Sequence, residues 1–383
     1  MKRLVRCLPE AMLVLWMLTA LTVPAQALEL PLNAPSAVLM EKTTGQVLYA
    51  CNEHEALEPA SVTKIMTILL TMEAIDSGKI GYDDVVSVSA HAASMGGSQV
   101  YLAEGEQITV EELLKSVCVA SGNDAAVALA EYVGGVEEAF VESMNEKAAA
   151  LGMTDTHFEN PTGLAAPGHV TSAYDIALMS RELLLRHPDI RRFTTIWTDT
   201  IRGGSFGLSN TNKLVRYYEG CTGLKTGYTS RAGYCMSATA EKDGMELIAA
   251  VMHAGTSEER NTDAKALLNY GFSTYALLTV ESAEPLPALP VTLGTAAQVQ
   301  VVLPAEGREL LMEKSRAAGL TQTVELPEAV CAPVEAGQML GTLRLWEGET
   351  LAAELPLVAM NAVEKRTWGQ VFTALLKRTV FIG

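Results

Sequence analysis

Three short motifs supply the groups that a serine acyl-transfer reaction needs. Ser61 stands three residues before Lys64, Ser121 stands two residues before Asn123, and Lys225-Thr226-Gly227 follows farther along the chain. A serine hydroxyl is a weak nucleophile until a nearby base accepts its proton, and a lysine becomes such a base when burial or a second cation lowers its pKa. The combination predicts a serine enzyme in which lysine takes the place of histidine.

The first motif is predicted to begin a helix. Pro59 ends the preceding loop, and residues 62–75 carry an apolar pattern with helical spacing. Residues three apart share a helix face, so the amine of Lys64 is expected to reach the Ser61 hydroxyl. The helix start also makes the backbone N–H of Ser61 an expected oxyanion donor. Considered alone, the motif also fits an ordinary helix cap beside a surface lysine.

The second motif is predicted to lie in a turn between two helices. A capping box at 109–112 opens a helix that runs to residue 119, and another helix is expected over 124–133. Gly122 allows the turn to bring Ser121 and Asn123 to one side, where they would relay a proton to a leaving amine and hydrogen-bond a substrate carbonyl. A simple helix–helix turn favours the same residue types and is the alternative.

The third motif is predicted to lie in a strand over 221–228 with a free edge that could receive an extended peptide. Lys225 and Thr226 would bind a carboxylate, and Gly227 lacks the side chain that would block close approach. The backbone N–H of Tyr228 is the expected second oxyanion donor. A hairpin strand that happens to end in glycine is the alternative.

The elements around these motifs predict a mixed α/β (α+β) domain over residues 34–278. A hairpin at 37–40 and 46–49 comes first, and the expected later elements are helices at 171–185 and 263–270 and strands at 234–240 and 247–253. A proline-rich stretch at 284–290 marks a boundary. The residues from there to 361 carry short Val- and Leu-rich runs, which predict a small all-β domain without a catalytic constellation.

Both ends of the chain suggest contact with a membrane or its export machinery. Residues 1–27 combine a basic start, an apolar run and Ala25-Gln26-Ala27, which predicts a cleaved signal peptide; a retained anchor is the alternative. Residues 363–383 form an expected basic amphipathic helix at the membrane interface, unless the helix packs back on its own domain. The enzyme is therefore expected at the outer face of the cytoplasmic membrane.

The charge and cysteine content narrow the possible partners and cofactors. Residues 1–27 carry a net +2, so the mature chain falls from −17 to about −19, which argues against nucleic acid as a partner. Five cysteines remain after export, and no Cys/His pair has zinc-ligand spacing, so neither a metal nor another cofactor is expected. Cys221 and Cys235 flank the third motif and are either bridged or separate buried thiols.

At this point the chain resembles the low-molecular-mass penicillin-binding proteins, the D-alanyl-D-alanine carboxypeptidases of peptidase family S11. The resemblance covers nearly the whole mature chain. It extends past the three motifs to Asn160-Pro161-Thr162-Gly163-Leu164, Gly168-His169, Ser172-Ala173-Tyr174-Asp175 and Leu267-Leu268-Asn269-Tyr270-Gly271-Phe272. It implies the DD-peptidase/beta-lactamase-like transpeptidase fold, followed by the β-rich domain and an amphipathic anchor.

The resemblance also implies roles for individual residues. Ser61 is similar to the acylated nucleophile and Lys64 to its base, while Ser121, Asn123 and Lys225 match groups that shuttle protons and orient substrate. Thr226 and Arg260 match positions that bind the terminal carboxylate, although Glu258 and Glu259 leave a surface charge cluster as the alternative for Arg260. His169 and Asp175 match structural positions. Tyr228 stands where some members carry histidine.

The implied substrate is a peptidoglycan stem peptide ending in D-Ala-D-Ala, and beta-lactams would acylate the same serine. A DD-endopeptidase, a beta-lactamase and a non-catalytic muropeptide or beta-lactam sensor are the rival functions. No Glu-x-x-Leu-Asn segment lies between Asn123 and Lys225, and Gly122 replaces the usual Asp, which argues against a class A lactamase. All five catalytic candidates are present, which argues against a sensor.

Overall fold

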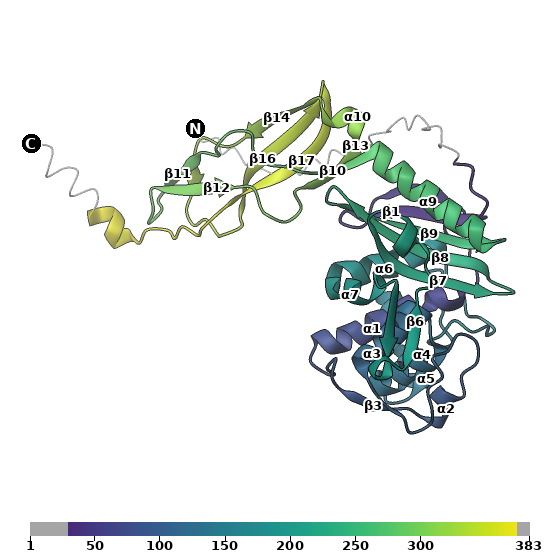
Figure 1. Ribbon diagram of the computed structural model, residues 1–383. Helices are drawn as coiled ribbons and strands as arrows, with labels where there is room; N and C mark the ends of the chain where they lie inside the picture. Colours follow the sequence, from purple (N-terminus) through teal and green to yellow (C-terminus); the bar gives the residue numbers. More distant parts are fainter. Residues whose placement is uncertain (1–29, 374–383) are drawn as a thin grey trace, which may run out of the picture. The chain divides into compact units, whose positions relative to one another are not determined.

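The computed structural model describes residues 30–373 (Figure 1). The predicted signal peptide therefore lies outside the described residues, as do residues 374–383 of the predicted anchor. In the described part of the chain, no helix is long and apolar enough to cross a membrane.

A five-stranded antiparallel sheet forms the centre of the first half of the fold. Its order is β2-β1-β9-β8-β7, so the strand that carries the third motif, β7, lies at one edge. The two strands of the expected N-terminal hairpin pair with each other, which confirms that prediction. The strand bounds are β1 (Ser36–Glu41), β2 (Val47–Cys51), β7 (Cys221–Thr229), β8 (Gly233–Lys242) and β9 (Met245–Ala254).

Helices cover both faces of this sheet (Figure 1). α9 packs on one face, where Gly271 lies against Leu247, and α6 lies on the other, where Ser180 hydrogen-bonds Ser237. The helices are α1 (Lys64–Asp76), α2 (Ala90–Ala93), α3 (Val110–Lys115), α4 (Asn123–Gly134), α5 (Glu137–Ala150), α6 (Ala173–Arg186), α7 (Arg191–Thr194), α8 (Leu214–Tyr217) and α9 (Ser257–Thr274). Two small two-stranded sheets pair β3 (Val85–Ser87) with β4 (Gln107–Thr109) and β5 (Thr198–Ile201) with β6 (Phe206–Ser209).

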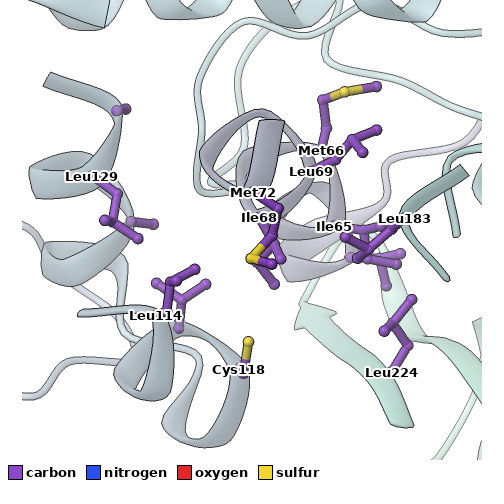
Figure 2. Close-up of a cluster of buried hydrophobic side chains, with 14 of the residues drawn as sticks. Ile65, Met66, Ile68, Leu69, Met72, Leu114, Cys118, Leu129, Leu183 and Leu224 are labelled. Atoms are coloured by element: carbon purple, nitrogen blue, oxygen red, sulfur yellow. The ribbon is translucent and has the colours of Figure 1, made fainter. Parts of the chain in front are cut away.

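α1 runs through the middle of the apolar core, and this position fixes the first motif. Figure 2 shows its apolar side chains facing Leu114, Cys118 and Leu129 in one direction and Leu183 and Leu224 in the other. A helix surrounded by protein is apolar on all sides, which explains why its sequence lacks a polar face. The core residues labelled on α1 are Ile65, Met66, Ile68, Leu69 and Met72, all fully buried.

Several predicted elements need correction at their ends. The helix expected to run from the capping box to residue 119 is α3 followed by a π-helix, Ser116–Ala120. The last helix of the region begins at Ser257, earlier than the expected residue 263, because Thr256 and Glu259 form a capping box. The start of α6 is fixed by Ser172, whose side chain accepts a hydrogen bond from the backbone N–H of Asp175.

The C-terminal part is β-rich, as expected, and has its own core of buried Val, Leu and Ala side chains. A six-stranded sheet has the order β14-β16-β17-β12-β11-β15, and β10 (Tyr275–Thr279) pairs with β13 (Glu309–Glu313). Pro290, expected in the boundary, lies within β11. The sheet strands are β11 (Ala288–Thr292), β12 (Gln298–Val302), β14 (Leu320–Glu325), β15 (Val330–Cys331), β16 (Met339–Glu347) and β17 (Thr350–Ala359), and α10 (Lys314–Ala317) follows β13.

Candidate active site

Ser61 lies in a 3₁₀ turn, Ala60–Thr63, directly before α1. The expected helix start is therefore confirmed, with a tighter turn than an α-helix at the serine itself. The turn is held in a crowded position, because a side chain at Gly163 would collide with the Ala60 carbonyl. Ala60 itself has a left-handed backbone with φ 48°. The surrounding structure thus fixes the position of Ser61 directly before the first residue of α1.

Lys64 is fully buried, and its amine donates a 2.8 Å hydrogen bond to the Ser61 hydroxyl oxygen. It also donates to the Asn123 side-chain oxygen at 2.6 Å and to the Thr162 carbonyl at 2.8 Å. Burial lowers the pKa of Lys64 well below its ordinary value, and the nearby charge of Lys225 lowers it further. A neutral amine at this position can accept the serine proton.

Lys225 is the second buried amine of the site. It donates to the Ser121 hydroxyl oxygen at 2.9 Å and to the Thr226 carbonyl at 3.0 Å. Burial lowers the pKa of Lys225 to about 7, and the charge of Arg260 acts in the same direction. The group can therefore exchange a proton near neutral pH.

Ser121 and Asn123 connect the two lysines. Ser121 ends the π-helix with a left-handed backbone, φ 62° and ψ 29°, and Asn123 is the first residue of α4. The Ser121 hydroxyl meets Lys225 while the Asn123 side-chain oxygen meets Lys64. The Asn123 amide nitrogen donates to the Gly96 carbonyl at 2.7 Å, which fixes the orientation of the amide. The second motif thus lies in the turn that was predicted and touches both other motifs.

The edge strand β7 lies directly against the serine turn at Gly227. A Cβ at this residue would fall 2.7 Å from the Pro59 carbonyl oxygen and 2.9 Å from the Ser61 backbone nitrogen, so only glycine fits. Thr226 donates its hydroxyl to the Thr211 hydroxyl at 2.7 Å. The neighbouring Tyr228 is largely exposed, and its ring lies 4.3 Å from that of Tyr234.

Arg260 lies in the first turn of α9, and only 6% of its surface is exposed. Its guanidinium donates to the Asn261 side-chain oxygen and lies over the Tyr234 ring, and it forms no ion pair with an acid in residues 30–373. Burial lowers the pKa of Arg260 to about 10. Because the residue is buried, it is not part of a surface charge cluster with Glu258 and Glu259.

His169 and Asp175 support neighbouring structure and do not join this network. The His169 Nδ1 accepts from the Glu159 backbone N–H at 3.0 Å, and its Nε2 lies 2.8 Å from the Thr63 hydroxyl. Burial lowers the pKa of His169 to about 4, so the ring is neutral. Asp175 accepts from the Asp155 backbone and the Thr156 hydroxyl.

Some residues contribute to the site through groups that no sequence motif marks. The carbonyls of Gly96 and Thr162 orient Asn123 and Lys64, and any residue type could supply them. Cys118 lies near Lys225, and Thr211 hydrogen-bonds Thr226, only because the fold brings distant parts of the chain together. No cluster of His, Cys, Asp or Glu within residues 30–373 could hold a metal ion, and Cys51, Cys118, Cys221, Cys235 and Cys331 are free thiols.

The arrangement combines a nucleophile, a base whose pKa is lowered, a second proton carrier and a buried arginine that forms no ion pair within residues 30–373. These groups suit acyl transfer from a peptide that ends in a carboxylate, with the hydroxyl oxygen of Ser61 as the atom that is acylated. Buried lysines with lowered pKa values in contact with two serines are costly to fold and are typical of a catalytic site.

Comparisons with known proteins agree with this chemistry. Residues 22–256 match the family model described as D-alanyl-D-alanine carboxypeptidase, and residues 281–365 match the C-terminal domain of penicillin-binding protein 5. The chain is 43% identical to the D-alanyl-D-alanine carboxypeptidase DacF of Bacillus subtilis, with 92% of this chain and 90% of the relative covered. It is 36% identical to DacD of Escherichia coli, with 90% and 89% covered.

Solved structures show the same fold. Penicillin-binding protein 5 of Haemophilus influenzae superimposes with a TM-score of 0.78 at 30% identity, covering 88% of this chain and 99% of that structure. Penicillin-binding protein D2 of Listeria monocytogenes, solved in its ampicillin-bound form, has a TM-score of 0.59 at 33% identity and covers 64% of this chain and 99% of that structure. The expected DD-peptidase fold with a β-rich C-terminal domain is thereby confirmed.

Proposed function

Since the chain belongs to the D-alanyl-D-alanine carboxypeptidase family, we propose that it removes the terminal D-alanine from peptidoglycan stem peptides that end in D-Ala-D-Ala. The observation that carries the proposal is the 2.8 Å hydrogen bond between the buried Lys64 amine and the Ser61 hydroxyl. Burial lowers the pKa of Lys64, and a lysine that readily gives up its proton beside a serine hydroxyl is the base that a serine nucleophile needs.

In the first step, Lys64 takes the proton of Ser61 while the serine oxygen attacks the carbonyl of the penultimate D-alanine. The backbone N–H groups of Ser61 and Tyr228 are the proposed donors to the oxyanion that forms. Ser121, linked to Lys225 by a 2.9 Å hydrogen bond, passes a proton to the leaving amine. D-alanine departs and leaves an ester on Ser61, which water then hydrolyses.

Substrate binding is assigned to the residues that surround this centre. Lys225, Thr226 and Arg260 bind the terminal carboxylate, and burial of Arg260 without an acid partner in the described residues supports its part. Asn123 holds the peptide carbonyl on the other side of the scissile bond. Gly227 lets the substrate strand and the serine turn approach β7 closely.

Beta-lactams present a strained amide and a carboxylate to the same groups, so they are expected to acylate Ser61. The ampicillin-bound Listeria relative supports this expectation. No cofactor or metal enters the proposed reaction.

We further propose that the mature enzyme begins after residue 27 and consists of a catalytic domain followed by a β-rich domain. The β-rich domain begins with β10, which pairs with β13, and its core extends to Val363. A membrane-contacting helix completes it; this helix begins at Trp368 rather than at the expected residue 363, because Val363 and Lys365 form β-bridges with Val334 and Gly294. Trp368 and Phe372, at the described start of that helix, are 90% and 63% exposed, which supports a surface for lipid contact. The enzyme would then act at the outer face of the cytoplasmic membrane as a peripheral protein.

Replacement of the nucleophile tests the proposed chemistry. Ser61→Ala is expected to abolish labelling by fluorescent penicillin and peptide hydrolysis, while the circular dichroism spectrum and the melting temperature stay close to those of the wild type. Covalent labelling of this variant would contradict the assignment of Ser61.

A further inference from the structure

Asn123, which faces Lys64, is fixed by a segment that lies outside all three motifs. Residues 96–102 supply the Gly96 carbonyl to the Asn123 side chain at 2.7 Å and the Ser98 carbonyl to its backbone N–H at 2.7 Å. Gly97 lies so close that a Cβ there would fall 2.8 Å from the Asn123 amide nitrogen. The position of this segment therefore decides where the Asn123 amide points.

The same segment is held from inside the fold by α4. The buried Asp124 carboxylate accepts hydrogen bonds from the backbone N–H groups of Val100 and Leu102, both at 3.0 Å. These bonds use the N–H groups of the segment and leave its carbonyls to other partners. Asp124 thus secures one side of the segment only.

Arg202, on the turn between β5 and β6, secures the opposite side. Its guanidinium donates to the carbonyls of Val100 at 2.9 Å and Tyr101 at 3.0 Å and forms an ion pair with Glu106 at 2.6 Å. Its own backbone N–H donates to the Glu112 carboxylate of α3 at 2.7 Å. One side chain therefore ties the 96–102 segment to a hairpin that is distant in sequence.

Both ends of this contact have left-handed backbones. Tyr101 has φ 56° and Arg202 has φ 54°, although neither is glycine. Residues adopt this conformation against their preference only where the surrounding contacts impose it, and such residues are concentrated at functional sites. The strain at both residues is consistent with a contact that serves the site rather than the hairpin alone.

We propose that Arg202 is a positioning residue for acylation, which acts by holding segment 96–102 so that Asn123 presents its oxygen to Lys64 and its nitrogen to the substrate. The inference rests on the proposed function of Ser61 and deepens it. A lysine at this position would keep the charge but could not donate to two carbonyls and Glu106 together.

The test is a double-mutant cycle between Arg202 and Asn123, with the second-order rate of acylation by fluorescent penicillin as the readout. Arg202→Ala is expected to slow acylation about 10-fold or more, because a displaced positioning group weakens the reacting geometry. In an Asn123→Ala background the same replacement is expected to change the rate less than twofold, since both act through one group. Additive effects, or an Arg202→Ala rate within twofold of the wild type, would overturn the proposal.

Arg192→Ala is the matched control, because Arg192 also bridges to α3, through Glu111 at 3.1 Å, and does not reach segment 96–102. It is expected to acylate at the wild-type rate. The hydrogen bond from Lys64 to the Asn123 oxygen favours the charged amine, so its loss should lower the pKa of Lys64 further. The acid limb of the pH–rate profile should therefore move to lower pH in Arg202→Ala and not in Arg192→Ala.

If Arg202→Ala fails to fold, Arg202→Lys replaces it in the cycle, with the same expected pattern and the same contradicting result. In every series, rapid labelling of the wild type and none of Ser61→Ala shows that Ser61 reacts as proposed, so failure of the Arg202 proposal is distinguishable from failure of the proposed function.

Discussion

The amine of Lys225 and the hydroxyl of Ser121 lie 2.9 Å apart in a fully buried contact between an edge strand and a helix–helix turn. This contact joins the third motif to the second, as the amine of Lys64 joins the second to the first. Each lysine thus links two motifs and is also an ionisable group. We therefore expect the protonation states of both lysines to affect the rate of the reaction.

We predict a bell-shaped pH dependence of kcat/KM for D-alanine release. Neutral Lys64 is the base, so the rate rises as pH increases through its lowered pKa. Lys225 must be charged to bind the carboxylate, so the rate falls as pH increases through its pKa of about 7. Because the two lysines interact, the apparent pKa values read from the profile belong to the pair rather than to either lysine alone.

Measured pH profiles with two substrates separate these two effects. An ester substrate whose leaving group lacks a carboxylate should retain the acid limb and lose the alkaline limb. A carboxylate substrate whose rate stays level from pH 7 to about 10 would contradict the role given to charged Lys225.

We predict that Gly227→Ala strongly slows acylation. The new Cβ would meet the backbone of Pro59 and Ser61, so either β7 or the serine turn must shift. Displacement of a nucleophile by about 1 Å can lower a rate about 100-fold, and the rate of penicillin labelling measures this loss.

Gly207→Ala is the control for this substitution, because a Cβ at Gly207 in β6 would meet nothing within 4 Å. That variant should label normally. Normal labelling of Gly227→Ala would show that the serine turn tolerates a side chain there.

The Ser61 environment shows how far the sequence alone could lead. The motif side chains, the helix after Ser61, the turn at Ser121 and the strand at Lys225 were predictable because each depends on local spacing and turn chemistry. The carbonyls of Gly96 and Thr162 were not, since a backbone group leaves no trace in residue type.

The predicted and observed ends of helices also differ according to whether local residues or tertiary packing determine them. The early start of α9 was in fact encoded by Thr256 and Glu259, whereas the π-helix at Ser116–Ala120 depends on tertiary packing that no short pattern specifies. Helix α5 was not anticipated; the strongest local mark of its start is the pair Glu137 and Glu138 in its first turn.

We predict that Arg260→Gln lowers kcat/KM for D-Ala-D-Ala peptides by about 10- to 100-fold, the effect of losing a charged hydrogen bond to a carboxylate. The loss should be absent for the ester without a carboxylate. Steady-state kinetics with both substrates provides the measurement.

Arg231→Gln is the matched control, because Arg231 is an exposed arginine whose ion pair with Glu58 measures 2.7 Å. It should leave both substrates unaffected. An equal loss for both substrates in Arg260→Gln would point to a structural role for Arg260 instead.

We predict that deletion of residues 367–383 releases active enzyme from membranes. The cut should not begin at residue 363, because Val363 is buried in the β-rich core and pairs with Val334. Removal of the exposed Trp368 and Phe372 takes away apolar contact with lipid, which vesicle sedimentation measures.

The matched variant is Trp368→Ser with Phe372→Ser in the full-length chain, which should bind vesicles more weakly while D-alanine release from a free peptide stays unchanged. Sedimentation of the truncated protein with vesicles at high salt would contradict the membrane role of this helix.

The most direct test of the account is release of D-alanine from diacetyl-L-Lys-D-Ala-D-Ala, with and without penicillin pretreatment and with Ser61→Ala beside the wild type. The account predicts release by the wild type alone, abolished by penicillin. Stable penicillin labelling at Ser61 without release would instead indicate an endopeptidase or a sensor, and rapid penicillin turnover would indicate a lactamase; either result would contradict a carboxypeptidase.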